Sequence, residues 1–220
     1  MNWKTVYVDV ETIPSQADDA LDRIKMNIKP PSRLSKAESI ETWWAEKSEE
    51  AVKERWLQTA LNGAFGELVV IGYAIEDEEA QTVVKVSTES DLLQDFFTRL
   101  DGIAPHFVGH NVGFDLRYLA HRSLIRRVRP PFIIPWTSAP WQGKYGDTMF
   151  AWCGATGKIK LKELCHVLGI DAGEDIDGSD VWERVEAGDM EAVARHCRLD
   201  VERTRKIWKM LEEWRRPNDR

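Results

Sequence analysis

The chain has 220 residues, a formal net charge of −7 and a hydrophobic content of 43%. This content is ample for a core, and the length favours a single domain over residues 1–220, with an insertion, rather than two domains. The negative charge argues against a broad basic surface for duplex DNA. The N-terminus is too polar for a secretory signal, and the longest apolar run, residues 68–75, is far shorter than the roughly 20 residues that a membrane helix needs. For this reason no membrane partner is expected. Cys153, Cys165 and Cys197 lack the spacing of metal ligands, so we expect buried or free thiols in a reducing, cytoplasmic compartment.

The hydrophobic pattern predicts strands followed by an alternation of strands and helices. A strand is expected over residues 4–10, and the near-continuous apolar run over 68–76 is typical of a strand covered on both faces. Residues 82–87 alternate as in an outer strand, and residues 90–100 have helical spacing with Ser90 as N-cap. We expect a strand over 106–109, a helix over 114–124 and a proline-rich loop over 127–143. A helix closed by Gly169 is expected over 161–168, and a helical segment in one or two pieces over 189–214. This order predicts a mixed α/β sheet with helices on its faces.

Residues 15–63 are too many for a simple connection between two strands. The pair Pro30-Pro31 interrupts any helix. The apolar residues beyond this pair, which include Trp43 and Trp56, follow helical spacing with charged residues between them. We therefore expect one or two amphipathic helices, inserted directly after the first strand. A connection of this length is more often functional than idle.

Three short stretches, far apart in the chain, carry acidic residues at comparable places. Asp9 and Glu11 are two apart on a predicted strand, so they point to the same face. Asp115 lies where a predicted strand gives way to a helix. His196 and Asp200 are four apart on a predicted helix and therefore share a face. Four carboxylates and a histidine can thus converge on one point, and carboxylate oxygens are the ligands that Mg²⁺ and Mn²⁺ prefer.

These motifs, in this order, resemble those of the DnaQ-like (DEDD) superfamily of 3′–5′ exonucleases. The first is Asp-x-Glu at Asp9, the second is His-Asn-x-x-Phe-Asp ending at Asp115, and the third ends at Asp200. The resemblance covers roughly residues 4–14 and 64–212. It implies a ribonuclease H-like fold, in which a mixed β-sheet is flanked by helices.

The third motif departs from the pattern of the superfamily. One branch has Tyr-x-x-x-Asp and the other His-x-x-x-x-Asp, whereas residues 196–200 read His-x-x-x-Asp. The residues after Asp200, and the stretch 175–179, look like the tyrosine branch. Within it they are similar to predicted phage and bacterial exonucleases related to the proofreading domain of B-family DNA polymerases. His196 therefore stands where a tyrosine usually stands.

The resemblance implies a two-metal-ion hydrolysis with Mg²⁺ or Mn²⁺. Asp9 would be shared between the two ions, Glu11 and Asp200 would complete the site of the ion that activates water, and Asp115 would hold the second ion. His196 would orient or deprotonate the attacking water, a task that suits an imidazole, whose ordinary pKa is about 6.5. The alternatives are a packed helix histidine at 196 and ordinary solvated acids at the other positions.

Contacts with substrate are expected near the second motif and along a basic segment. The residues predicted to contact substrate are Thr12, Asn111, Phe114, Arg126 and Arg127. The basic segment also contains Arg122 and Arg129, and with Trp136 and Trp141 it could follow a single strand by charge and stacking. The alternative is a solvated helix end. The acidic loop 174–180 is expected to be solvated, because it lacks the spaced glutamate of an EF-hand.

The sequence thus predicts a metal-dependent 3′–5′ exonuclease acting on single-stranded DNA ends, in a bacterial or phage-infected cytoplasm. An exoribonuclease, and a catalytically silent module that binds nucleic acid, stay open as alternatives. Because the chain contains no polymerase domain, a proofreading role would require a polymerase or another replication or repair partner in trans.

Overall fold

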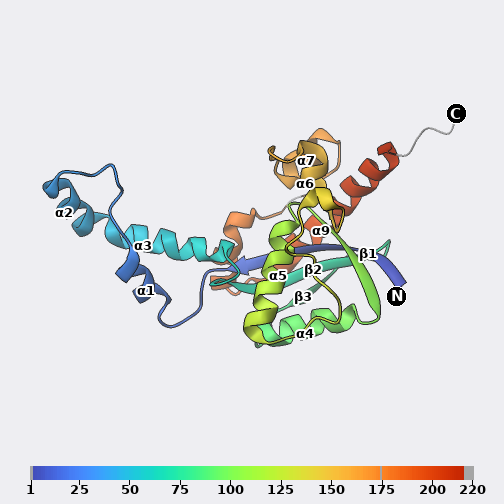
Figure 1. The fold of residues 1–220 in the computed structure, drawn as a ribbon, viewed down its shortest axis with the longest axis horizontal. Coiled ribbons are helices and arrows are strands. Elements are labelled where there is room, and N and C mark those ends of the chain that lie inside the picture. The colour runs from blue at the N-terminus through green and yellow to red at the C-terminus, as the bar shows by residue number, and fades with distance from the viewer. Residues whose placement is uncertain (1, 174, 216–220) are drawn as a thin grey trace. The chain divides into compact units, whose positions relative to one another are not determined.

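The computed structural model describes residues 2–173 and 175–215. The chain divides into two compact units. Residues up to 11 and from 68 onward form the first, which we call the sheet unit, and residues 12–67 form the second, the helical unit (Figure 1). The helical unit contains helices, as predicted for residues 15–63.

Within the described residues, the sheet has five strands in the order β3-β2-β1-β4-β5. Strand β4 is parallel to both β1 and β5, whereas β3 is antiparallel to β2. The strands are β1 Asn2–Ile13, β2 Glu67–Ile75, β3 Gln81–Val84, β4 Ile103–Gly109 and β5 Gly146–Asp147. The sheet is therefore mixed, which confirms the predicted fold class. The two-residue strand β5 was not predicted.

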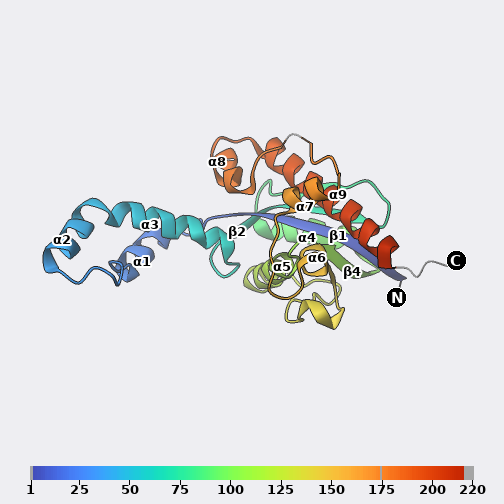
Figure 2. The same cartoon turned by 90° about the horizontal axis from the view of Figure 1, so that it is seen from above.

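The two faces of the sheet are covered by different helices (Figure 2). On one face, Val6, Val8 and Val10 of β1 join a core with residues of α4 (Glu89–Arg99) and α5 (Gly113–Arg126). On the other face, Tyr7 packs with Val201 of α9 (Met190–Arg215). Because side chains alternate along a strand, Asp9 and Glu11 share the face of Tyr7, on the side of α9.

Helix α9 packs unusually close to strand β2 of the sheet. It is one continuous helix of 26 residues, so the alternative of two pieces was wrong. A Cβ atom added at Gly72 of β2 would meet Cys197 Sγ at 2.9 Å and the Cys197 carbonyl oxygen at 3.1 Å. The absence of a side chain at Gly72 is therefore what allows α9 to approach this closely.

The remaining elements are short. Helix α4 begins at Glu89 behind the N-cap Thr88, whose hydroxyl accepts the Asp91 N–H, so the prediction of Ser90 as the cap was wrong. The segment 127–143 contains one 3-10 turn, Pro140–Gln142. Helix α7 is closed as predicted by Gly169, which has a φ of 68°. The short helices of this part are α6 Thr148–Cys153, α7 Leu161–Val167, the 3-10 turn Gly178–Asp180 and α8 Val181–Glu186. Within the described ranges, no helix has the length and apolar character that crossing a membrane demands.

A buried ion cluster lies at the other end of α5 from the predicted acidic motif. The carboxylate of Glu89 accepts hydrogen bonds from Arg122 at 2.6 and 2.8 Å, from Arg126 at 2.6 Å and from the backbone N–H of Leu68 at 2.8 Å. Burial alone would raise the pKa of Glu89, but these hydrogen bonds hold it below its ordinary value. The cluster joins the first turn of α4, the last turns of α5 and the start of β2.

The helical unit contains α1 Ala20–Asn27, α2 Ala37–Glu46, α3 Ser48–Leu57 and the 3-10 turn Gln58–Leu61. Hydrogen bonds fasten its first residues to the end of α3. The Trp56 indole donates to the Ser15 carbonyl at 2.9 Å, and the Ser15 N–H donates to Thr59 Oγ1 at 2.8 Å. Trp43 is buried and makes an edge contact with Trp44. These contacts give the inserted helices a packed interior of their own.

Candidate active site

The first acidic pair lies at the end of β1, on the face covered by α9. Glu11 is buried and Asp9 is partly buried. The intervening Val10 points to the opposite face, into the core formed with α4 and α5. Alternation of this kind fixes the direction of both carboxylates, because a shift of one residue would place both of them in the apolar core.

Asp115 reaches the same strand end from the first turn of α5. Its Oδ1 accepts the backbone N–H of Val10 at 3.0 Å, between the two acidic residues of β1. The turn before α5 depends on Asn111, which has a φ of 59° and whose carbonyl accepts the Phe114 N–H at 2.9 Å. Asn111 also donates its backbone N–H to Asp147 at 3.1 Å. A left-handed residue, which asparagine tolerates well, thus turns the chain so that Asp115 faces β1.

His196 and Asp200 complete the cluster from one face of α9. His196 is buried, and its Nε2 lies 3.5 Å from Glu11 Oε1 and 4.0 Å from Asp200 Oδ2. Between them in sequence, the Cys197 thiol donates to the Asp9 carbonyl oxygen at 3.4 Å and so joins α9 to β1. The structure therefore brings together the five residues predicted from the three motifs.

The carboxylates of this cluster are buried and repel one another, and both effects disfavour their charged forms. Burial raises the pKa of Asp9 well above its ordinary value, and the carboxylates of Glu11 and Asp115 raise it further. Burial likewise raises the pKa of Glu11, and Asp200 and Asp115 add to this effect. Burial also raises the pKa of Asp115, although the hydrogen bond from Val10 works in the opposite direction. Carboxylates placed in this way are stabilised by a bound cation.

The donor set suits a hard divalent cation. Its oxygens come from carboxylates, which Mg²⁺ and Mn²⁺ prefer to sulfur. The Cys197 thiol also lies close to Asp9 and Glu11. Burial raises the pKa of this thiol well above its ordinary value, and the charge of Asp9 adds to this. A hard cation prefers carboxylate oxygens to sulfur, so the carboxylates match it better than Cys197 does.

Comparison with known families agrees with this geometry. The family model described as "Predicted 3′–5′ exonuclease related to the exonuclease domain of PolB" matches residues 59–215. The chain belongs to this family. No curated protein gives a significant match. The matched segment contains Asp115, His196 and Asp200 but begins after Asp9, so the PolB-exonuclease-related family and the geometry of β1 contribute separate parts of the site.

The motifs did not predict two residues that hold the third motif of this exonuclease-family site in place. Asp175 Oδ2 lies 2.5 Å from His196 Nδ1, and Arg203 Nη1 lies 2.8 Å from the same oxygen. Arg203 also pairs with Asp200. The Asp175 side chain is only 2% exposed, so the prediction that loop 174–180 is solvated was wrong at this position, although Asp177 is exposed as expected. The available signal was the stretch 175–179, which already looked like the tyrosine branch.

Two further polar residues near the second motif have structural contacts. His110 lies between the Thr148 hydroxyl, 2.8 Å from its Nδ1, and the Ile159 carbonyl, 2.9 Å from its Nε2. Burial lowers the pKa of His110, so the ring is favoured in its neutral form. Asp147 accepts the backbone N–H groups of Met149 and Phe150 and caps α6. Both residues therefore fix the chain around Asp115.

The residues predicted to contact substrate lie in different environments. Asn111 is exposed beside the site, whereas Phe114 is partly buried and packs on Tyr118 with ring centroids 5.5 Å apart. Within the helical unit, the Thr12 hydroxyl donates to the Ala60 carbonyl at 2.8 Å. Arg126 is engaged by Glu89.

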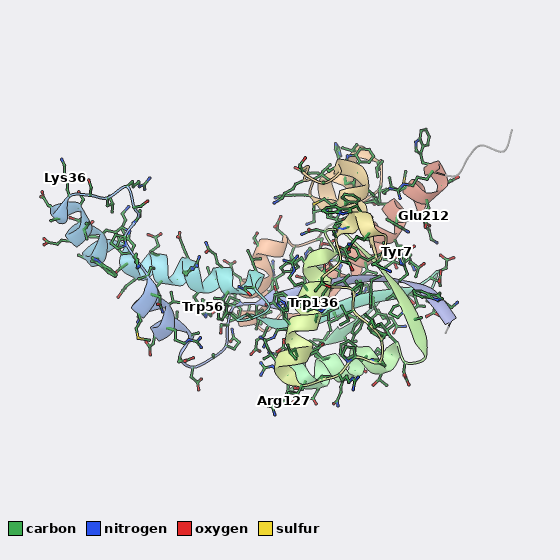
Figure 3. All side chains as sticks on the ribbon, viewed as in Figure 1. Tyr7, Lys36, Trp56, Arg127, Trp136 and Glu212 are labelled. Carbon is green, nitrogen blue, oxygen red and sulfur yellow. The ribbon has the colours of Figure 1, made fainter. Side chains whose placement is uncertain are left out.

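The basic segment is split by the fold. Arg122 is buried in the Glu89 cluster, whereas Arg127 is exposed, with a φ of 57° at the end of α5 (Figure 3). Arg127, Arg129 and Trp136 line a surface hollow with a volume of about 530 Å³. At 1.5 Å per residue, the end of α5 lies about 18 Å from Asp115 along the helix.

Proposed function

We propose that this protein is a metal-dependent exonuclease that removes nucleotides from the 3′ ends of single-stranded DNA. Membership of the exonuclease family supports nuclease activity. The observation that carries the proposal is the convergence of Asp9, Glu11, Asp115 and Asp200 on one point, from a strand and two helices. An acidic cluster that is buried and mutually repulsive lowers stability, and its retention is explained by a function that needs it.

In this proposal the four carboxylates hold Mg²⁺ or Mn²⁺. When bound, a pair of such ions supplies positive charge that lowers the pKa of a water molecule and stabilises the leaving oxygen. Asp9 and Glu11 are suited to this because they project from a strand end whose backbone is fixed by the sheet. Asp115 is suited because its hydrogen bond with Val10 orients its carboxylate beside Asp9 and Glu11.

His196 is proposed to handle the proton of the attacking water. Its Nε2 faces Glu11 and Asp200, the two ligands proposed for the water-activating side of the site. A ring nitrogen in this position can orient a water molecule by hydrogen bonding and accept its proton. The buried ring has little freedom to turn, so the direction of Nε2 is set before substrate binds.

Support for a single-stranded substrate comes from the hollow at the end of α5. Arginine side chains neutralise phosphates, and an aromatic ring offers a stacking surface for any base. Arg127, Arg129 and Trp136 supply both kinds of group, about 18 Å along the helix from Asp115. A strand whose 3′ end lies at the carboxylates could reach this hollow with nucleotides further upstream.

The proposal is tested with 5′-labelled single-stranded DNA and RNA oligonucleotides of the same sequence, incubated with Mg²⁺, with Mn²⁺ or with EDTA. We expect a ladder of DNA products that shortens from the 3′ end, requires metal and is absent in the Asp9→Ala variant. Faster degradation of the RNA would replace the DNA assignment by an exoribonuclease. Binding without cleavage under every metal condition would show a silent binding module and overturn the proposed activity.

A further inference from the structure

The two ring nitrogens of His196 face different partners. Nδ1 lies 2.5 Å from Asp175 Oδ2, whereas Nε2 faces Glu11 at 3.5 Å and Asp200 at 4.0 Å. An ionised carboxylate can only accept hydrogen bonds, so the short contact with Asp175 requires the proton to be on Nδ1. In a neutral imidazole the other nitrogen then has a free lone pair. That lone pair points to the acidic cluster.

Asp175 is itself held firmly in the orientation that this contact needs. Arg203 Nη1 donates to Asp175 Oδ2 at 2.8 Å, and Arg203 Nε donates to the Ala172 carbonyl at 3.0 Å, so both ends of this loop segment are fixed to α9. Lys162 donates to the Ile176 carbonyl at 2.6 Å, directly after Asp175. The side chains of Asp175 and Arg203 are 2% and 3% exposed. Water therefore does not compete for the hydrogen bond with His196.

The charge state of Asp175 agrees with the role of an acceptor. Burial alone would raise the pKa of Asp175, but hydrogen bonds from His196 and Arg203 hold it below its ordinary value. Asp175 thus differs from Asp9, Glu11 and Asp115, whose pKa values are raised. It has cationic and N–H partners of its own and does not need a metal ion to compensate its charge.

We infer that Asp175 is a positioning residue, which fixes the His196 ring with the proton on Nδ1 and with Nε2 directed at the carboxylate cluster. This inference rests on the proposed function, in which Nε2 receives the proton of the attacking water. Without Asp175 the ring can carry its proton on Nε2 and donate it to Glu11, which leaves no lone pair for water. Partners of this kind, one bond removed from the reacting groups, commonly change activity by about 10–100-fold.

The test compares Asp175→Asn with the control Asp177→Asn. Asparagine keeps the volume of residue 175 but can donate its amide N–H to Nδ1 and so favour the proton on Nε2. Asp177 lies in the same loop, is exposed, and accepts hydrogen bonds from the backbone N–H and the hydroxyl of the neighbouring Ser179. Both variants remove one negative charge from this loop, so a difference between them reports the contact with His196.

The first readout is NMR of histidine-labelled protein, without metal or substrate, at about pH 8, where an ordinary imidazole is neutral. The His196 signal is identified by its loss in His196→Gln. We expect the proton on Nδ1 in the wild type and in Asp177→Asn, and a shift toward Nε2 in Asp175→Asn. A wild-type ring protonated on Nε2 would overturn the inference, whether or not the protein proves to be a nuclease.

The second readout is kinetic. In Asp175→Asn we expect kcat to fall about 10–100-fold with little change in KM, while Asp177→Asn keeps the wild-type values. Thermal unfolding and Mn²⁺ titration of the same variants separate the alternatives. A loss of Mn²⁺ affinity as large as that in Asp200→Asn would make Asp175 a metal ligand and overturn its positioning role. An equal loss of activity in both variants would reduce the role to loop stability, with the same consequence.

Discussion

Buried carboxylates at two places in the sheet unit differ in how their charge is compensated. Glu89, the first residue of α4, accepts hydrogen bonds from Arg122, Arg126 and a backbone N–H, and its pKa is lowered despite burial. Asp9 and the acids around it lie at the end of β1, where burial and mutual repulsion raise their pKa values. The difference shows that burial alone does not identify a functional acid. Burial without a compensating cation does, because folding gains nothing from such a group.

The largest effect is expected from Asp9→Ala. Removing this carboxylate from the uncompensated group should abolish cleavage, because no other side chain can take its place at the end of β1. Stability in metal-free buffer should be unchanged or slightly raised, since one source of repulsion is lost. Activity and thermal unfolding are measured on the same preparation, and more than a few per cent of the wild-type rate would contradict the metal-binding assignment.

A large but smaller effect is expected at His196. His196→Ala should lower the rate by roughly 10²–10⁴-fold, the usual range for a general acid or base. His196→Tyr should recover part of this loss, because the spacing to Asp200 is that of the tyrosine branch. Single-turnover rates at saturating metal measure both effects. Normal activity in the alanine variant would instead assign His196 to packing.

At Glu89, whose charge is compensated by arginines, we expect substitution to lower stability and to leave activity unchanged. Glu89→Gln removes the buried carboxylate to which both Arg122 and Arg126 donate, so we expect the free energy of unfolding to fall by about 3–5 kcal/mol. The rate per folded molecule should stay close to wild type, because this cluster lies at the far end of α5 from Asp115. Denaturant unfolding and active-site titration provide the two numbers. A loss of activity without a loss of stability would contradict this prediction and would assign Glu89 a role in the activity.

The smallest effect concerns pH. The raised pKa values of Asp9, Glu11 and Asp115 mean that the folded state binds more protons than the unfolded state above the ordinary carboxyl pKa of about 4. The stabilising effect of this protonation is complete below that pKa and is lost as pH rises through the raised values, by at most about 1.4 kcal/mol per pH unit for each extra proton.

In metal-free buffer, wild-type stability should therefore decline with rising pH over this window, and Asp9→Asn should reduce the slope. Saturating Mg²⁺ should remove it, because binding to the folded state compensates the charge. Thermal melts across pH, with and without Mg²⁺, measure the effect. A slope that is the same in wild type and variant would show that Asp9 carries no raised pKa.

Features that depend on neighbouring residues could be predicted from the sequence, whereas features that depend on residues far apart in the chain could not. The alternation that pairs Asp9 with Glu11, and the helical turn that pairs His196 with Asp200, are local regularities that can be seen in the chain itself. Their convergence with Asp115 required the resemblance to a family, because nothing in the sequence states which strand ends are neighbours. The helical insertion was visible from its length and from the spacing of its apolar residues.

The interactions that were missed are long-range pairings. Asp175 lies 21 residues before His196, and Arg126 lies 37 residues after Glu89, so neither partner could be recognised from its neighbours in sequence. An acidic loop and a basic helix end look solvated until the fold supplies their partners. The short helices α6 and α8, of six residues each, offer too few turns for a periodic pattern.

Gly72 affects the distance between α9 and the strand β1, although it belongs to none of the three acidic motifs. The lack of a side chain at Gly72 lets α9, which carries the third motif, lie close against β2. A methyl group at this position would push α9 away from the sheet, and His196 and Asp200 would move with it, so that their distances to Glu11 on β1 increase. The distance between the first and third motifs therefore depends on a residue of β2 that belongs to neither motif.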